Sequence, residues 1–188
     1  MEDGSSVQVD FLSTGKQSFE CVTMKDFTYV VIPMEAGELI LVLPDEGKSP
    51  NSIMKEKNIN RILAEITSEK ENNKKNVKVE FPTYDIEYEV DSEKMKKILQ
   101  EIGIKMLFSQ PKWIEGINGS AVEVFQKARF IVNEEGVEGA AATPTISYVA
   151  AGANEDEPLE LIFDRPFMYI LIKDGVPLFI GTVYNPAE

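Results

Sequence analysis

The residue types of this chain exclude most ordinary catalytic sites. Its 188 residues contain no histidine and a single cysteine, Cys21. Serine or cysteine nucleophiles activated by histidine, zinc sites that use histidine and clusters of metal-binding thiolates are therefore excluded. Phosphate-binding glycine motifs are absent as well. We predict that the protein is not an enzyme and holds no metal ion and no cofactor.

One acidic run could attract a hard cation. Asn154, Glu155, Asp156 and Glu157 are consecutive and carry oxygen ligands of the type that calcium prefers. The run has neither the ligand spacing nor the turn glycine of a known calcium loop. We therefore interpret it as a solvated acidic loop.

The most informative segment runs from Asn133 to Pro158, between two strongly apolar stretches. Its front half consists almost entirely of small side chains, which fit into a narrow slot without steric cost. β-Branched residues within it favour a strand. These residues are Val137, Thr143, Thr145, Ile146 and Val149. A plain linker rarely needs both properties.

The elements around this segment are predicted to be mainly strands. Residues 27–33 and 39–43 indicate a buried hairpin joined around Ala36 and Gly37, and residues 167–172 and 177–183 indicate a second one. Asp174-Gly175 between the latter two is a strong turn signal, because both residues tolerate positive φ. Residues 84–90 alternate between apolar and acidic side chains, which is typical of a strand with one face in water.

Two helices are predicted. Ser49-Pro50 begins one that continues to about Ile66, and Asp91 or Ser92 caps another that Gly103 ends. The second helix carries an apolar stripe that we assign to packing. Its members are Met95, Ile98, Leu99 and Ile102.

Four ordered motifs resemble the serpins, a family of inhibitors that trap serine proteases. The first motif resembles the serpin hinge and consists of Glu134, Glu135, Gly136, Val137, Glu138, Gly139, Ala140, Ala141, Ala142 and Thr143. The others resemble internal and closing motifs of the family and comprise residues 42–46, residues 99–104, and residues 163–167 with 179–186.

The resemblance covers essentially the whole chain and implies an α+β fold with mixed β-sheets, a few helices and an exposed reactive-centre loop. Residues 1–188 would form a partial serpin domain, with the hinge and loop at 134–158. A family member is roughly twice as long, so the chain resembles the C-terminal half. The N-terminal half, which supplies most helices and the far side of the insertion slot, would be a complementary partner.

The resemblance implies that the protein is a suicide substrate of a serine protease. The protease attacks the loop, forms an acyl-enzyme and is carried across the molecule as the cut loop inserts into a sheet. By the family's spacing from the hinge glycine Gly136, the reactive bond lies between Ala150 and Ala151. The small Ala150 suits an elastase-like protease. Ser147, Tyr148 and Val149 would also contribute to specificity. If the count from the hinge is shifted so that Tyr148 or Val149 precedes the cut bond, the loop would suit a chymotrypsin-like or an elastase-like enzyme.

Strand periodicity predicts which loop residues enter the sheet interior on insertion. The inward set is small or β-branched and uncharged: Val137, Gly139, Ala141, Thr143, Thr145 and Ser147. The outward set is Glu138, Ala140, Ala142, Pro144 and Ile146.

Three departures from the family pattern leave alternatives open. Pro144 lacks an N–H for a central strand, and Gln126 and Arg165 stand where the family usually has histidines. They favour a non-inhibitory serpin that acts as a substrate, carrier or storage protein. The third hypothesis is an inactive fragment that binds by strand addition through an unpaired edge near residues 121–133.

Charge and hydropathy limit the partners. The net charge of -13 argues against nucleic acid and anionic membranes, which need a basic patch, and no apolar run is long enough to span a membrane. The lysines at positions 70, 74, 75 and 78 are interpreted as part of a solvated loop. We predict an extracellular location and leave a cytoplasmic one open, because a single thiol fits both compartments.

Overall fold

A computed structural model of the protein describes residues 6–34, 37–68, 73–109, 123–134, 136–138 and 157–187. The chain divides into two compact units, one made of residues 1–85 and 131–188 and the other of residues 86–130. The predicted α+β class is confirmed, since a mixed sheet is combined with a few helices. Within the described residues, no helix is long and apolar enough to cross a membrane.

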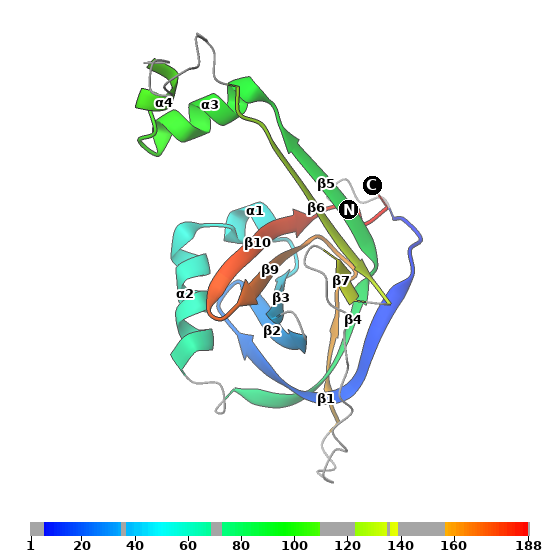
Figure 1. Cartoon of the computed structure of the whole chain (residues 1–188). Helices are drawn as coiled ribbons and strands as arrows, with labels where there is room; N and C mark the ends of the chain where they lie inside the picture. Colours follow the sequence, from blue (N-terminus) through cyan, green and yellow to red (C-terminus); the bar gives the residue numbers. More distant parts are fainter. Residues whose placement is uncertain are drawn as a thin grey trace. The chain divides into compact units, whose positions relative to one another are not determined.

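The first unit contains a seven-stranded sheet with the strand order β10-β9-β3-β2-β1-β4-β8. Its strands are β1 (Phe11–Thr23), β2 (Phe27–Met34), β3 (Gly37–Pro44), β4 (Lys74–Pro82), β8 (Leu159–Ile162), β9 (Phe167–Lys173) and β10 (Val176–Val183). Each pair of neighbours is antiparallel except β4 and β8, which are parallel. In Figure 1, β1 and β4 are long curved strands that run side by side.

Both predicted hairpins are confirmed. Strands β2 and β3 pair antiparallel from Met34 opposite Gly37, and β9 and β10 pair from Lys173 opposite Val176. The turn between β9 and β10 has positive φ at both Asp174 (52°) and Gly175 (78°), as the Asp-Gly signal predicts. Six consecutive residues of β9 are buried, which fits the buried core that these strands were expected to form.

Helices α1 (Pro50–Ile53) and α2 (Glu56–Ser68) cover one face of this sheet (Figure 1). Their buried isoleucines join the side chains of β2, β3 and β9 in one core. The members of this core are Phe27, Tyr29, Val31, Ile40, Val42, Ile53, Ile62, Ile66, Met168, Ile170 and Ile172. Burial of these apolar side chains is the main force that holds the first unit together.

The expectation of one continuous helix from Pro50 to about Ile66 is wrong. Met54 leaves helical geometry at φ -68° and ψ 62°, and its N–H closes α1 by donating to the Pro50 carbonyl at 2.9 Å. The Asn58 side-chain amide donates to the Ile53 carbonyl at 2.9 Å, which satisfies an acceptor that the break exposes. The break lets two short helices place Ile53 and Ile62 in the same core.

Strand β4 also corrects an expectation. Lys74, Lys75 and Lys78 lie within this strand rather than in a solvated loop. Val77 and Val79 of the same strand are fully buried and alternate with more exposed neighbours. Lys70 lies outside the described residues.

The second unit contains helices α3 (Ser92–Glu101) and α4 (Met106–Ser109) between β5 (Tyr84–Val90), which begins in the first unit, and β6 (Gln126–Asn133). The predicted cap is confirmed, because the Lys94 N–H donates to Asp91 Oδ1 at 2.8 Å. Gly103, with a φ of 99°, stands just after the end of α3 and takes the left-handed conformation typical of a helix end.

The apolar side chains of α3 are less buried than we expect for packing residues. Met95 is 7% exposed and Leu99 is half-buried, but Ile98 is 38% exposed, and Ile102, the residue directly after the helix, is 69% exposed. The alternation predicted for β5 is also incomplete, since Tyr84 and Val90 are buried while Tyr88 is 51% exposed. The packing assignment therefore holds for Met95 and is wrong for Ile102.

A three-stranded sheet has the order β5-β6-β7, where β7 is Gly136–Glu138. Strand β6 lies in the middle and has a neighbour on each side. The printed partners of β7 are Ile131 to Asn133, so the expected unpaired strand edge near residues 121–133 is wrong for these three residues.

Candidate functional site

The predicted hinge begins as a tight hairpin. Strand β7 pairs antiparallel with the end of β6, with Gly136 opposite Asn133, Val137 opposite Val132 and Glu138 opposite Ile131. The chain thus reverses within two residues after Asn133 and lies back along β6. The first hinge residues adopt a strand conformation, as their sequence predicts.

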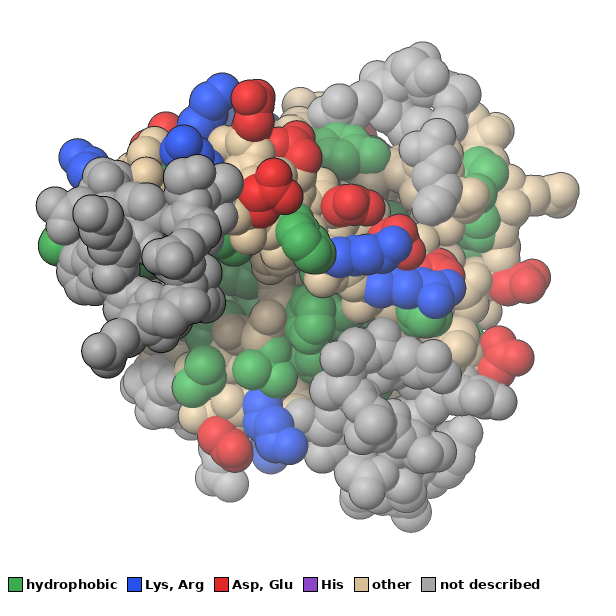
Figure 2. Space-filling view, turned by 45° about the horizontal axis from the view of Figure 1, so that its top comes forward, with side chains coloured by type: hydrophobic (Ala, Val, Ile, Leu, Met, Phe, Trp, Pro, Cys, Tyr) green, Lys and Arg blue, Asp and Glu red, His purple; other side chains and the backbone are tan. Residues whose placement is uncertain are grey.

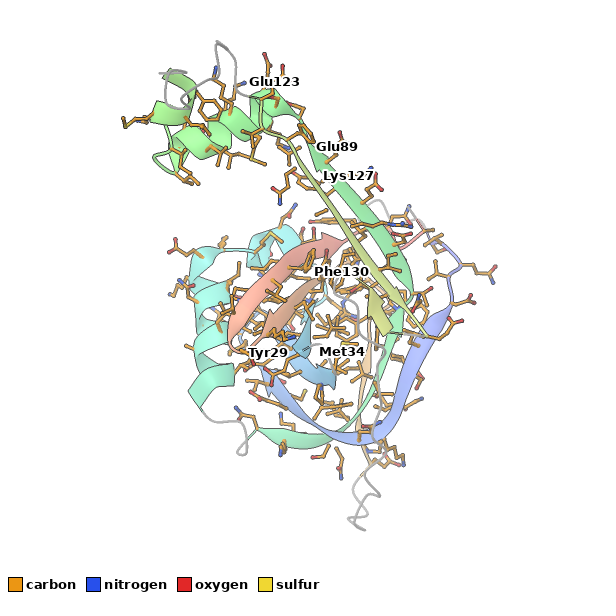
Figure 3. The ribbon with its side chains drawn as sticks, in the orientation of Figure 1. Tyr29, Met34, Glu89, Glu123, Lys127 and Phe130 are labelled. Atoms are coloured by element: carbon orange, nitrogen blue, oxygen red, sulfur yellow. The ribbon has the colours of Figure 1, made fainter. Side chains whose placement is uncertain are left out.

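Burial along β6 alternates towards its C-terminal end. Phe130 and Val132 are each 2% exposed, while Ile131 and Asn133 are half-buried. Lys127 and Phe130 both project from β6 in Figure 3, and Lys127 forms an ion pair with Glu87 of β5. The side-chain contact with Glu87 raises the pKa of Lys127, with smaller opposing effects from its surroundings.

Most of the predicted loop lies outside the described residues. This holds for Glu135, Gly139, Ala140, Ala141, Ala142, Thr143, Ser147, Tyr148, Val149, Ala150 and Ala151. Glu134 is described and exposed, directly after β6. The structure therefore positions the first residues of the hinge.

The chain that follows the loop returns as β8, the edge strand of the seven-stranded sheet. Its four residues pair in parallel with β4, from Leu159 opposite Val77 to Ile162 opposite Glu80. Leu161 is 7% exposed, whereas Leu159 and Ile162 are 43% and 40% exposed. The ladder ends where the Phe163 N–H donates to the Glu80 carbonyl at 2.8 Å.

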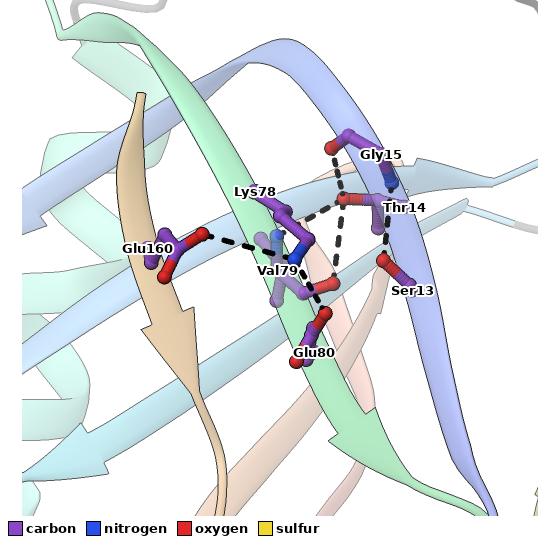
Figure 4. Close-up of polar contacts among 7 residues, drawn as sticks. All are labelled: Ser13, Thr14, Gly15, Lys78, Val79, Glu80 and Glu160. Carbon is purple, nitrogen blue, oxygen red and sulfur yellow. Dashed lines mark hydrogen bonds and ion pairs between the residues drawn. The ribbon is translucent and has the colours of Figure 1, made fainter. Parts of the chain in front are cut away.

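Charged side chains connect β8 to β4 (Figure 4). Lys78 Nζ lies 2.7 Å from Glu80 Oε1 on its own strand and 3.7 Å from Glu160 Oε1 on β8. The hydrogen bond to Glu80 is the main reason why the pKa of Lys78 is raised, and Glu160 adds to the effect. Lys78 thus carries its charge between two carboxylates, one on each strand.

On its other side, β4 meets an irregularity in β1. The register shifts between Ser13, opposite Glu80, and Lys16, opposite Lys78. Thr14 Oγ1 fills the gap by accepting from the Val79 N–H at 3.1 Å, and Gly15 has a φ of 66° (Figure 4). This is a β-bulge in which a side chain replaces the missing ladder partner.

Sequence reasoning missed the roles of Lys78, Glu160 and Thr14. The alternation of Lys78 and Glu80 in β4 could have suggested that they share one face. No sequence signal connects Lys78 to Glu160, because their contact depends on the parallel pairing of β4 with β8, two strands that are distant in the chain.

The two positions where the family usually has histidine differ in their surroundings. Gln126 is exposed at the first position of β6. Arg165 donates from Nε to the Pro44 carbonyl at 3.1 Å and from Nη1 to Asp164 Oδ1 at 3.2 Å. It also lines a cavity of about 120 Å³ together with Phe163, Phe167 and other residues of the first unit. Arg165 therefore ties the approach to β9 to the end of β3.

Positive and negative side chains are interspersed on the face that Figure 2 shows, where blue lysines and arginines lie beside red acidic residues. Exposed pairs such as Lys48–Asp26 and Arg61–Glu65 have this character. In the part of the chain that the structure describes, no group of three or more cysteine, aspartate and glutamate side chains could hold a metal ion.

A sequence model described as Serpin (serine protease inhibitor) matches residues 1–186. The chain belongs to the serpin family. It is 28% identical over 174 residues to an alpha-1-antitrypsin-like protein of Tamias sibiricus, covering 89% of this chain and 39% of that protein. It is 26% identical over 196 residues to the alpha-1-antitrypsin homolog of Cyprinus carpio, covering all of this chain and 50% of that protein. The predicted family is thereby confirmed.

Solved serpin structures share the fold. Serpin48 of the insect Tenebrio molitor is 29% identical with a TM-score of 0.63, and the match covers 94% of this chain and 46% of that one. A serpin of the trematode Schistosoma haematobium has a TM-score of 0.72 at 20% identity, with 96% and 48% coverage. The chain thus spans half or less of the length of these relatives. Serpins are in general protease inhibitors and not catalytic enzymes.

Proposed function

We propose that this chain supplies the reactive-loop half of a serpin that inhibits a serine protease as a suicide substrate. The pairing of β7 with β6 is the observation that carries the proposal, because the start of the loop is already added to β6 as an antiparallel strand. Serpin loop insertion is a known case of strand addition. Each further residue that pairs gains backbone hydrogen bonds and removes a loop residue from solvent.

Extending the register of β7 gives the inserted partners of the hinge. Gly139 would lie opposite Phe130, Ala141 opposite Ala128 and Thr143 opposite Gln126. Directly opposite residues of an antiparallel pair share a face. The buried Phe130 would then face a residue without a side chain, which fits the expectation that small residues enter the sheet interior.

Pro144 sets the limit of this pairing. In the same register it would lie opposite Phe125, the residue before β6 begins, which is 72% exposed. A proline there offers no N–H, and it would meet no partner residue within β6. Insertion beyond Thr143 therefore depends on a second neighbouring strand, which the N-terminal half of a full-length serpin would supply.

The reactive bond in this proposal is Ala150–Ala151, and the protease is elastase-like or chymotrypsin-like. The count from Gly136 and the small side chain of Ala150 support this choice. The loop residues Ser147, Tyr148 and Val149 would occupy the neighbouring subsites of the protease. An extracellular location suits such a partner.

The outer edge of β10 supports the proposal of a complementary N-terminal half. Strand β10 has β9 as its neighbour in the sheet order, and its eight residues carry no charge. Val176, Leu178 and Ile180 are 57%, 46% and 42% exposed. Sheet edges in soluble proteins are usually protected by charges, prolines, bulges or a covering segment. Strand β10 has Pro177 and a register shift between Pro177 and Phe179, but it has no charge. A segment from the other half of the domain would cover these side chains.

The test is incubation with pancreatic elastase, of the chain alone and together with a reconstructed N-terminal half, followed by a denaturing gel and mass spectrometry. We expect clean cleavage after Ala150 for the chain alone and a detergent-resistant covalent adduct for the reconstituted pair. Cleavage of the pair without any adduct would overturn the inhibitory mechanism and favour a serpin that acts as a substrate or carrier.

Two matched variants separate insertion from cleavage. Ala141→Arg places a long charged side chain on the inward face of the inserted strand, and Ala142→Arg places it on the outward face. We expect Ala141→Arg to convert the reconstituted inhibitor into a substrate, because burial of an unpaired guanidinium is costly. Ala142→Arg should retain the adduct. Equal behaviour of the two variants would show that the proposed register is wrong.

A further inference from the structure

The strand that receives the end of the loop is held by few contacts. Strand β8 has four residues and has β4 as its neighbour in the sheet order. Leu161 is its buried side chain, and the other three positions are exposed. Short edge strands with few buried contacts open locally at low free-energy cost. A modest additional contact can therefore change how firmly β8 is held.

We propose that Lys78 is a positioning residue that holds β8, and with it the C-terminal end of the reactive loop, through Glu160. The pairing register places Lys78 directly opposite Glu160. Their ion pair of 3.7 Å connects the two strands across their exposed face. The effect on the reactive loop rests on the proposed function. The contact between Lys78 and Glu160 does not, because it lies between β4 and β8.

Glu80 competes for the same ammonium group. Lys78 Nζ is 2.7 Å from Glu80 Oε1, closer than to Glu160, and the three side chains are 33%, 29% and 59% exposed in the order Lys78, Glu80, Glu160. A contact with Glu80 stays within β4 and holds nothing on β8. Removal of the Glu80 charge should therefore strengthen the attachment of β8, whereas removal of Glu160 should weaken it.

The strand that carries Lys78 is itself well fixed. Thr14 of β1 accepts from the Val79 N–H at 3.1 Å, one residue after Lys78, and the side chains of Val77 and Val79 are fully buried (Figure 4). The residues on either side of Lys78 are thus held in place, so β4 is firmly fixed and β8 is the more weakly held strand of the two.

Amide hydrogen exchange of the full chain tests the proposal without any protease. The Phe163 amide reports on the attachment of β8, because it donates to the Glu80 carbonyl at 2.8 Å. We expect Lys78→Met and Glu160→Gln to accelerate exchange at Phe163 by about two- to fivefold, the range of an exposed ion pair. Amides of β2 and β3 should be unaffected.

The remaining variants distinguish positioning from a general structural role. Lys78→Arg should preserve slow exchange, Lys78→Met should have no further effect in the Glu160→Gln background, and Glu80→Gln should slow exchange at Phe163. Lys127→Met, which removes a similar exposed cross-strand pair with Glu87 in the second unit, is the matched control and should leave Phe163 unchanged.

Unchanged exchange at Phe163 in Lys78→Met would overturn the proposal, as would an equal acceleration at β2 and β3. Acceleration by Glu80→Gln would also contradict it, since competition requires the opposite sign. Failure of the protease assay alongside these expected exchange rates would refute the inhibitory function and leave the role of Lys78 intact.

Discussion

The two units of the chain differ in how completely they bury their apolar side chains. In the first unit, α1 and α2 seal one face of the sheet, and Tyr29, Ile40 and Ile170 are fully buried. In the second unit, α3 and α4 with the turn between them expose Ile98, Ile102 and Met106 by 38%, 69% and 55%. The apolar residues recur with regular spacing in the elements of both units, so this spacing alone does not predict whether a side chain is buried.

The difference in burial between the two units reflects whether neighbouring elements of the same unit cover the apolar side chains. Strand β9 lies between β10 and β3, and α1 and α2 cover the core that it joins, so its apolar residues are enclosed within the first unit. Among the described residues of the second unit, the exposed stripe of α3 has no comparable cover. The largest effects of mutation are therefore expected in the core of the first unit.

Truncation of matched isoleucines is the strongest way to test the contrast. Ile170→Ala removes a fully buried side chain from β9, which lies between β10 and β3, and we expect it to lower the free energy of unfolding by about 2–5 kcal/mol. Ile102→Ala, at 69% exposure, should change it by less than about 0.5 kcal/mol. Urea denaturation followed by circular dichroism measures both. Similar losses would show that Ile102 is packed in solution.

Alanine substitutions at two glycines with positive φ distinguish a steric clash of the added Cβ from backbone strain alone. At Gly37, with a φ of 147°, an added Cβ would lie 2.1 Å from the Ile172 carbonyl oxygen. At Gly15, with a φ of 66°, it would meet no atom within 4 Å. We expect Gly37→Ala to destabilise by about 3 kcal/mol and Gly15→Ala by about 1 kcal/mol. Equal shifts of the urea midpoint in the two variants would mean that β3 and β9 move apart at no cost to accommodate the added Cβ at Gly37.

Much of the fold can be predicted from local signals in the sequence. The β9–β10 hairpin follows from a turn whose Asp174 and Gly175 both tolerate positive φ, and the start of α3 follows from the Asp91 cap. The break between α1 and α2 could not be predicted in this way. It depends on how Ile53 and Ile62 reach a common core, and tertiary packing of that kind overrides helix propensity.

The candidate site likewise has features that the sequence predicts and features that it does not. The small and β-branched residues of the hinge predict a strand, and Gly136–Glu138 forms one. The neighbour of that strand and its register with Val132 arise from the hairpin geometry. The Lys78–Glu160 contact has no sequence signal, because it requires the parallel pairing of strands that are distant in the sequence.

The buried thiol of Cys21 makes the stability of the first unit depend on pH. Burial raises the pKa of Cys21 above its ordinary value of 9.0, and the charge of Lys75 opposes this only in part. The unfolded chain therefore loses the thiol proton at a lower pH than the folded chain. This contribution is fully present below the ordinary thiol pKa and falls above it, by at most about 1.4 kcal/mol per pH unit.

Urea denaturation between about pH 8 and 10, which spans the ordinary thiol pKa, measures this slope, and Cys21→Ala is the control. The variant should show a shallower decline of the unfolding free energy with pH, whatever its absolute stability. Parallel curves for the two proteins would contradict a raised thiol pKa. Slow alkylation of Cys21 in the folded protein, compared with rapid alkylation in urea, is the expected companion result.

The smallest predicted effect concerns the cap of α3 in the second unit. Asp91→Ala removes the carboxylate that accepts from the Lys94 N–H, and we expect a loss of about 1 kcal/mol. Asp91→Ser keeps an acceptor at the same place and should lose only a small part of that. Exchange of the α3 amides is the sharpest measurement, since the effect should be confined to residues 86–130 if that unit opens independently. Equal acceleration in β2 and β3 would instead show that the two units unfold together, and the contrast between them would then concern burial and not cooperativity.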